Sequence, residues 1–296
     1  IMENYQKKDG LITDYVTDVE IENGNVWIST DRGIGTYDPT NRNWKFFGFR
    51  DGLTDQFVTS LAYDGKDMWA GSAHGIFRFN NGKWVAITPL SDGKSQWQDQ
   101  MVTELAFDKQ SNLWIGTQNG IWRLDAKSAE NKATFYDEKD GLADKSIHCL
   151  LVIENGSIYA GTQNGLSIFK NDKWETISLK DADGKSLDKM DISSLSYDEL
   201  LWIGTLSGLF KYDETKGYAE SIKTANGSIF SNIRSICAFG DSLWIGTSVG
   251  MAQIRKSDGS VTEEYRSTIV KEPFMEPGVS NIYFDGNVVH FFVVLS

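Results

Sequence analysis

The chain has 296 residues, of which 40% are hydrophobic and 12% are aromatic, so there is material for one large core. Its formal net charge is −12, from 41 acidic and 29 basic residues without a basic cluster, which argues against nucleic acid as a partner. No apolar run approaches the roughly 18 residues of a membrane-spanning helix, so we expect no membrane insertion of this segment. Cys149 and Cys237 fall in separate parts of the pattern described below, and we expect buried free thiols.

The first eleven residues, IMENYQKKDGL, look like the segments KFFGFRDGL at 45–53 and TFYDEKDGL at 134–142. Those later segments each end one structural unit. The N-terminus is therefore predicted to be an outermost strand with no unit before it. Because the chain begins at Ile1 without a signal peptide, we expect that a leader has been removed or that the chain is part of a longer protein.

A short phrase, exemplified by NLWIGTQNGI from Asn112, then returns six times at intervals of 42 to 45 residues. A degenerate seventh copy, NVVHFF, follows 46 residues after the sixth. The central aromatic position is occupied in turn by Trp27, Trp69, Trp114, Tyr159, Trp202, Trp244 and, in the degenerate copy, His290. A period in this range, with units made of short strands, is typical of a β-propeller.

Each unit is predicted to contain four short strands, as residues 97–136 illustrate. They are expected at Met101–Asp108, Leu113–Thr117, Ile121–Leu124 and about Thr134–Tyr136. Four antiparallel strands in sequence make one propeller blade. The phrase LWIGT is apolar on both sides of its strand, which predicts burial on both faces, between two neighbouring blades.

Two glycines recur in the phrase and have different predicted roles. The first follows the aromatic by two positions and leaves room for the neighbouring blade; it is found at Gly71, Gly116, Gly161, Gly204 and Gly246. The second ends the turn into the third strand, where a tight hairpin needs positive φ; it is found at Gly33, Gly75, Gly120, Gly165, Gly208 and Gly250.

The pattern predicts an all-β fold, a single seven-bladed β-propeller of four-stranded antiparallel blades that forms one domain over residues 1–296. Val279–Phe284 and Val288–Leu295 are predicted to be the first two strands of the seventh blade. The N-terminal strand would complete that blade, because an open ring leaves sheet edges exposed. The third strand is missing from this count, so we expect either that the last blade is short or that the chain is cut from a longer protein that continues past Ser296.

The phrase LWIGTxxGL, the Asp-Gly-Leu before new blades (Asp9–Leu11, Asp51–Leu53 and Asp140–Leu142) and the period near 44 resemble the two-component regulator propeller repeat. The resemblance covers most of the chain. It implies a periplasmic or extracellular bacterial domain that senses a small ligand, such as a glycan fragment, or a protein partner. In that family such propellers are parts of larger membrane sensors or are secreted or lipid-anchored proteins.

The predicted binding surface is the face that gathers the turns after second strands and the links between blades, since propellers generally bind ligands where such loops converge. Trp97 is the strongest candidate there, because a tryptophan flanked by Gln96, Gln98 and Asp99 could stack on a sugar ring. The alternative is that Trp97 caps the core beneath the loop. The full candidate set is Trp97, Gln100, Tyr15, Phe57, Arg32, His74, Gln118, Gln163 and Lys189.

Catalysis has no sequence signature in this chain. His74, His148 and His290 occupy unrelated positions, and neither HExxH nor CxxC supports a metal site. We therefore expect no cofactor and no enzymatic activity. Two alternatives stay open: a lyase or hydrolase with its site in the central opening, and a structural or assembly module.

Overall fold

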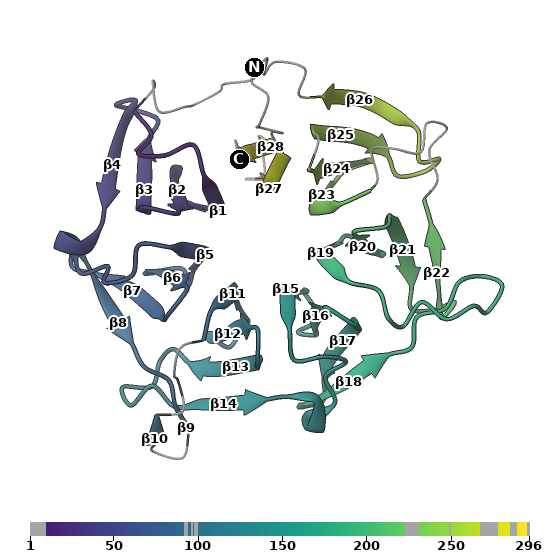
Figure 1. Ribbon diagram of the computed structural model, residues 1–296, viewed down its shortest axis with the longest axis horizontal. Helices are drawn as coiled ribbons and strands as arrows, with labels where there is room; N and C mark the ends of the chain where they lie inside the picture. Colours follow the sequence, from purple (N-terminus) through teal and green to yellow (C-terminus); the bar gives the residue numbers. More distant parts are fainter. Residues whose placement is uncertain are drawn as a thin grey trace. The chain divides into compact units, whose positions relative to one another are not determined.

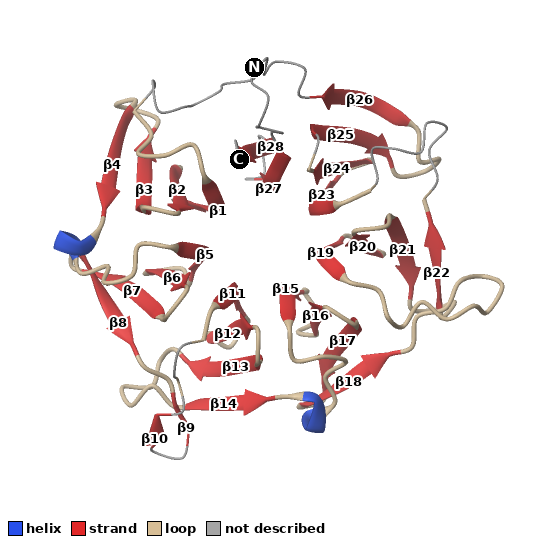
Figure 2. Cartoon of the chain, in the orientation of Figure 1, coloured by secondary structure: helices blue, strands red, loops and turns tan. Residues whose placement is uncertain are grey.

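The computed structural model describes residues 10–91, 94–95, 97, 100–222, 231–248, 250–266, 278–284 and 289–294. Within these ranges the regular structure is β-strand apart from two 3₁₀ turns, η2 (Phe49–Asp51) and η3 (Glu138–Asp140) (Figure 2). The chain divides into two compact units. Unit 1 comprises Ile1–Gln118 and Trp122–Phe135, and unit 2 comprises Asn119–Ile121 and Tyr136–Ser296.

Unit 1 carries three four-stranded antiparallel sheets, in each of which every strand pairs with its neighbour in sequence (Figure 1). Blade one is β1 (Val16–Glu22), β2 (Asn25–Thr30), β3 (Gly33–Asp38) and β4 (Asn43–Phe47). Blade two is β5 (Val58–Tyr63), β6 (Met68–Ser72), β7 (Ile76–Asn80) and β8 (Lys83–Ile87). Blade three is β11 (Val102–Phe107), β12 (Asn112–Thr117), β13 (Gly120–Asp125) and β14 (Ala133–Tyr136). The first two residues of β13 and the last residue of β14 are assigned to unit 2. A small extra sheet, β9 (Leu90–Ser91) with β10 (Lys94–Ser95), lies between blades two and three in sequence.

Unit 2 carries three further four-stranded sheets of the same order. Blade four is β15 (Ile147–Val152), β16 (Ile158–Thr162), β17 (Gly165–Lys170) and β18 (Lys173–Ile177). Blade five is β19 (Ile192–Tyr197), β20 (Leu201–Thr205), β21 (Leu209–Asp213) and β22 (Tyr218–Ser221). Blade six is β23 (Ile233–Phe239), β24 (Ser242–Thr247), β25 (Gly250–Arg255) and β26 (Val261–Arg266). A two-stranded sheet follows, β27 (Gly278–Phe284) with β28 (Val289–Val294).

The prediction of seven four-stranded blades is wrong: the fold is a β-propeller with six four-stranded blades among the described residues. The two strands predicted to open a seventh blade do form, but they make only the two-stranded sheet β27–β28. A blade is a meander in which each strand pairs with its sequence neighbour. Among the described residues, β27 and β28 supply only two of the four strands that such a meander needs. Residues 1–9, most of the segment predicted as the closing outer strand, lie outside the described residues.

The aromatic phrase forms the second strand of each of the six blades, as predicted, and its aromatic side chains fill the core. Trp69, Trp114, Tyr159 and Trp202 are among the largest side chains that are at most 2% exposed. Burial on both faces of these strands is therefore confirmed. The two cysteines are free, with Cys149 buried and Cys237 half-buried.

The first glycine of the phrase makes room for the opening residue of the next blade, as predicted. A Cβ placed on Gly71 would lie 2.3 Å from Val102 Cγ1, and one on Gly204 would lie 2.6 Å from Ile233 Cγ2. Gly161 has the same relation to Ile192, at 2.6 Å. All three separations are far shorter than carbon atoms tolerate, so glycine is required for the first strand of one blade to lie against the second strand of another.

A bulge follows each opening residue, and in three blades its extra residue adds a hydrogen bond to the next blade. Pairing shifts by one residue after Val16, Val58, Val102, Ile147, Ile192 and Ile233. The extra residue is turned toward the next first strand. Thr17 Oγ1 donates to Val58 O at 2.6 Å, Thr59 Oγ1 to Val102 O at 2.8 Å and Ser193 Oγ to Ile233 O at 2.5 Å.

The second glycine of the phrase follows the prediction at only some positions. Gly33, Gly120, Gly165 and Gly250 have φ between 121° and 151°. Gly75 and Gly208 lie outside the left-handed region, so the expectation of positive φ there is wrong. The residues before them, Ala-His and Leu-Ser, form a bend rather than the tight turn made by Asp-Arg or Gln-Asn.

The two glycines of blade five provide a direct test of the contact between blades. We expect Gly204→Ala to lower the free energy of unfolding by about 1–3 kcal/mol, because the new methyl group overlaps Ile233. Gly208→Ala is the control, since the nearest atom to its Cβ is 3.8 Å away, and it should change stability by no more than about 0.5 kcal/mol. Urea unfolding measures both. Equal effects of the two substitutions would contradict the assignment.

Candidate functional site

The turn after a second strand and the link before the same blade lie together. Ala73 N–H donates to Phe57 O at 3.1 Å in blade two, and Gln163 N–H donates to Ser146 O at 3.0 Å in blade four. Loop residues distant in sequence thus share one edge of a blade.

Asp55 holds these loops together in blade two. Its carboxylate accepts hydrogen bonds from Phe57 N–H at 3.2 Å and His74 N–H at 2.9 Å, and it lies 3.0 Å from His74 Nδ1. Burial raises the pKa of Asp55, but hydrogen bonds from Ser72, Phe57 and His74 outweigh burial and hold the pKa below its ordinary value. Asp55 is therefore a carboxylate that fixes the position of His74.

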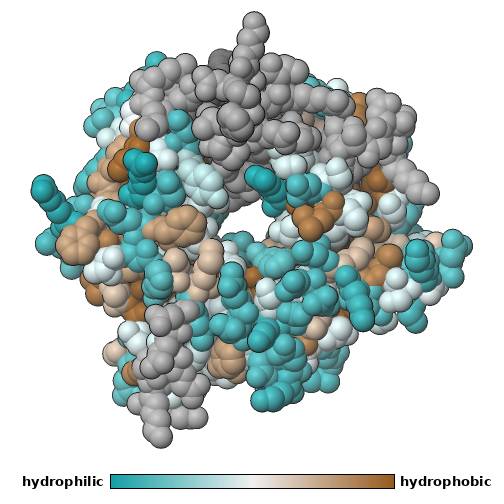
Figure 3. Space-filling model, viewed as in Figure 1, coloured by the Kyte–Doolittle hydropathy of each residue, from teal (hydrophilic) through white to brown (hydrophobic). Residues whose placement is uncertain are grey.

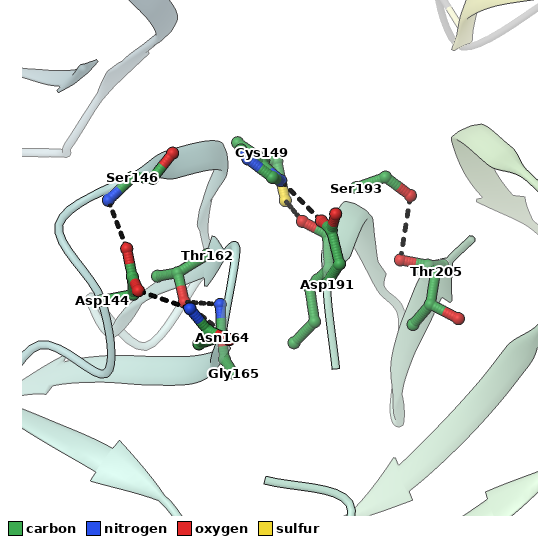
Figure 4. A network of polar contacts seen from close by, with 12 residues as sticks. Asp144, Ser146, Cys149, Thr162, Asn164, Gly165, Asp191, Ser193 and Thr205 are labelled. Carbon is green, nitrogen blue, oxygen red and sulfur yellow. Dashed lines mark hydrogen bonds and ion pairs between the residues drawn. The ribbon is translucent and has the colours of Figure 1, made fainter. Parts of the chain in front are cut away.

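Asp144 does the same in blade four, where it accepts from Ser146 N–H at 2.8 Å and from Asn164 Nδ2 at 2.7 Å (Figure 4). Asp55 and Asp144 each stand two residues after an Asp-Gly-Leu triplet. Sequence reasoning noted the triplet and missed the second aspartate. The signal was the shared pattern D-G-L-x-D, which would have identified it.

A pocket of about 350 Å³ lies in unit 1 beside these loops. One part of its wall is apolar, from Ile76, Phe77, Ala86, Ile87 and Trp97, and the other is polar, from Thr54, Asp55, His74 and Thr88. The apolar part comes from β7 and β8 together with the segment after β10. The polar part comes mainly from the link and turn of blade two. This mixture is typical of a site for a small organic ligand.

Trp97 has both of the roles considered for it. Its ring lies 5.7 Å from that of Trp122 in an edge-on arrangement, and it packs against the core cluster that contains Val102 and Leu105. It also forms part of the pocket wall. Its Nε1 is buried and finds no acceptor among the described residues. A buried indole N–H normally has a hydrogen-bond partner, so this donor is an exception within the described residues.

Of the nine candidate residues, only His74 and Trp97 line this pocket. Gln100 Oε1 accepts a hydrogen bond from Trp122 Nε1 at 3.1 Å, and Gln118 Nε2 contacts Met101 Sδ at 3.7 Å. Tyr15 and Arg32 are exposed in blade one, and Phe57 is half-buried in blade two. Gln163 and Lys189 are exposed in unit 2. Sequence reasoning missed Thr54, Thr88 and the apolar wall, since nothing in the strand pattern marks a pocket.

A histidine–aspartate pair lies in unit 2, at the bulge of β15. His148 Nδ1 is 2.8 Å from Asp191 Oδ1, and the two side chains are 31% and 36% exposed. A carboxylate in this position orients an imidazole, as in general acid–base sites. No cluster of three or more metal-ligating side chains occurs in the part of the chain that the structure describes. None of the helices described there has the length and apolar character needed to cross a membrane.

The surface in Figure 3 carries mainly hydrophilic residues, with hydrophobic ones in small separate groups. On the residues visible there, no broad apolar area marks a docking surface.

No protein-family model matches the sequence, and no curated protein is significantly similar to it. Solved structures with the same fold include two extracellular domains from B. thetaiotaomicron, attributed to a one-component system and to a hybrid two-component system. They are 20% and 19% identical to this chain, cover 97% and 99% of it and have TM-scores of 0.76 and 0.78. This chain spans only 38% and 40% of the length of those chains.

Virginiamycin B lyase from Staphylococcus aureus also has this fold, with 15% identity and a TM-score of 0.70 over 96% of this chain and 94% of the lyase. At these identities the likeness establishes the fold alone, a β-propeller. The fold occurs both in sensor domains and in an enzyme, so function depends on the site.

Asp55→Ala tests the assigned role of the aspartate. We expect a loss of about 1–2 kcal/mol in the free energy of unfolding at pH 7, because two backbone N–H groups and His74 lose their acceptor. Since the pKa of Asp55 is lowered, its contribution is present above the ordinary carboxyl pKa of about 4 and disappears as the pH falls through the lowered value. Urea unfolding at about pH 7 and pH 3 should therefore show a smaller difference in acid. The exposed Asp183→Ala is the control, and an undiminished difference at low pH would contradict the assignment.

Proposed function

We propose that this chain is a non-catalytic recognition domain of a bacterial extracytoplasmic protein and that it binds a small, neutral, hydroxyl-rich ligand in the pocket of unit 1. The observation that carries the proposal is the mixed wall of that pocket. An indole and aliphatic side chains face one side, and a fixed His74–Asp55 pair with two threonines faces the other.

The chemistry of the wall favours a sugar ring. The apolar C–H face of a sugar stacks on an aromatic ring such as Trp97, while its hydroxyl groups need donors and acceptors at the edge. His74, Thr54 and Thr88 provide them. A volume of about 350 Å³ is at the small end of ligand sites, which suits one or two sugar rings better than a long chain.

The sensor context is supported by the repeat and by the fold shared with extracellular domains from B. thetaiotaomicron. We infer a location outside the cytoplasm and a place in a longer signalling protein. This chain spans about two fifths of the length of those chains. A role in signalling is therefore part of our proposal and does not follow from the structural similarity.

One observation favours a second candidate, a propeller enzyme with lyase or hydrolase activity. His148 is oriented by Asp191 and is partly exposed, as a general base must be. Turnover of a polysaccharide or a lactone that is abolished by His148→Ala would establish this candidate and overturn the first.

Isothermal titration of the whole chain with neutral mono- and oligosaccharides tests the binding proposal. We expect Trp97→Ala to weaken binding at least about tenfold, because the stacking surface is lost. Val85→Ala is the matched control: Val85 is half exposed on β8, beside the pocket residues Ala86 and Ile87 but outside the wall. Circular dichroism confirms that each variant is folded. If Trp97→Ala binds as tightly as the unmodified chain, the pocket is not the site.

A further inference from the structure

Three carboxyl groups gather on the first strands of unit 1, away from the pocket. Asp18 and Glu20 belong to β1, Glu104 belongs to β11, and Ser60 of the intervening β5 lies between them. Ser60 Oγ is 3.2 Å from Asp18 Oδ2 and 3.2 Å from Glu104 Oε1. One hydroxyl group thus joins carboxyl groups from two other blades.

Hydrogen-bond counting at Ser60 favours a proton on one of these carboxyl groups, because a single hydrogen shared between two carboxylates makes two weak bonds. A hydroxyl has one hydrogen to donate, and Ser60 Oγ also accepts from Leu105 N–H at 3.0 Å. Its hydrogen can serve Asp18 or Glu104 but not both. Asp18 Oδ2 already accepts Leu61 N–H at 2.7 Å, which favours its ionised form. Glu104 is therefore the group that holds the proton and donates to Ser60.

The surroundings of Glu104 also favour its protonated form. Glu104 is half-buried, and loss of water around its carboxyl group is the main cause that raises its pKa well above the ordinary value, followed by the charges of Asp18 and Glu20. Burial, together with the charge of Asp18, raises the pKa of Glu20 to about 8.

The strands around the cluster contribute no positive charge. Strand β5 has no charged residue, and its titratable Tyr63 packs against the core cluster of Met68 and Trp84. The second strands β2, β6 and β12 carry no charged residue either. On β1, Glu22 accepts a hydrogen bond from Trp27 Nε1 at 2.8 Å. Nothing on these strands replaces a proton as the partner of the carboxylates.

We propose that the Asp18–Ser60–Glu104 contact is a pH-sensitive clamp that holds the first strands of blades one, two and three together while a carboxyl proton is present and loosens when that proton is lost. In the ionised form, Glu104 has no hydrogen to share with Ser60, and its charge repels Asp18 and Glu20 across a buried space. The interface between the three first strands is then weakened.

The direction of the pH dependence follows from the retained proton. The unfolded chain releases it near the ordinary glutamate pKa, whereas the folded chain keeps it to higher pH. The stabilisation is complete below the ordinary value and declines as the pH rises toward the raised values, about 8 for Glu20. For each retained proton, the unfolding equilibrium constant should increase about tenfold per pH unit across that window.

The experiment is urea unfolding of the whole chain between about pH 5 and pH 9, for the unmodified protein, Glu104→Gln and Glu20→Gln. Glutamine copies the protonated acid, because its Nε2–H can donate to Ser60 and it cannot ionise. Each glutamine variant should lose the tenfold-per-unit dependence of one proton and should be the more stable protein at alkaline pH. Glu130→Gln, at a highly exposed side chain of the same unit, should leave the pH dependence unchanged.

An unchanged pH dependence in Glu104→Gln would overturn the clamp, whatever the result for Glu20→Gln. If Glu104→Gln does not fold, carboxyl ¹³C NMR titration of the unmodified chain decides the question. Two glutamate resonances that titrate well above the ordinary range support the proposal, and ordinary titration of all glutamates refutes it. Neither readout depends on a ligand, so the result is independent of the pocket.

Discussion

The fit of one blade's opening residue over the glycine of the preceding blade is the contact on which the described fold depends. Val102 over Gly71, Ile192 over Gly161 and Ile233 over Gly204 are three copies of it. The bulge beside the opening residue then directs a hydroxyl group to the next strand, so that close packing and hydrogen bonding occur at the same place. The spacing of the phrase is constrained because a blade that takes part in two such contacts must supply an opening residue for one and a glycine for the other.

The same constraint explains why the repeat says little about function. Residues that recur in each blade are required by the contact between blades, and chemistry must come from positions that the repeat leaves free. Trp97 is such a position, since it follows the extra strands β9 and β10 that lie outside the four-strand pattern. The pocket lies beside that irregular segment and uses β7 and β8 of an ordinary blade as its apolar wall. Interruption of the repeat was thus a better guide to the pocket than the repeat itself.

Local patterns predicted the local structure well, whereas they did not determine how the chain ends or how distant strands combine. Burial of Trp114 and the role of Gly71 follow from a few adjacent residues and were predicted correctly. The blade number was wrong because two strands at the C-terminus resemble the start of a complete blade. Asp18, Ser60 and Glu104 are more than 40 residues apart from one to the next, and each is unremarkable within its own strand. Only the packing of the first strands brings them together.

Comparison within the chain shows that carboxyl groups are not needed for this interface. In unit 2, Ser194 occupies the position after the bulge and accepts Ile236 N–H at 3.0 Å, as Ser60 accepts Leu105 N–H, and Ser235 stands at the position that Glu104 takes in unit 1. A neutral hydroxyl therefore satisfies the backbone of the next blade. Burying Glu104 near Asp18 and Glu20 costs stability that a serine would spare, because desolvated like charges oppose folding. Since the fold offers the cheaper solution in its own second unit, the acidic cluster in unit 1 is better explained by sensitivity to protons than by stability.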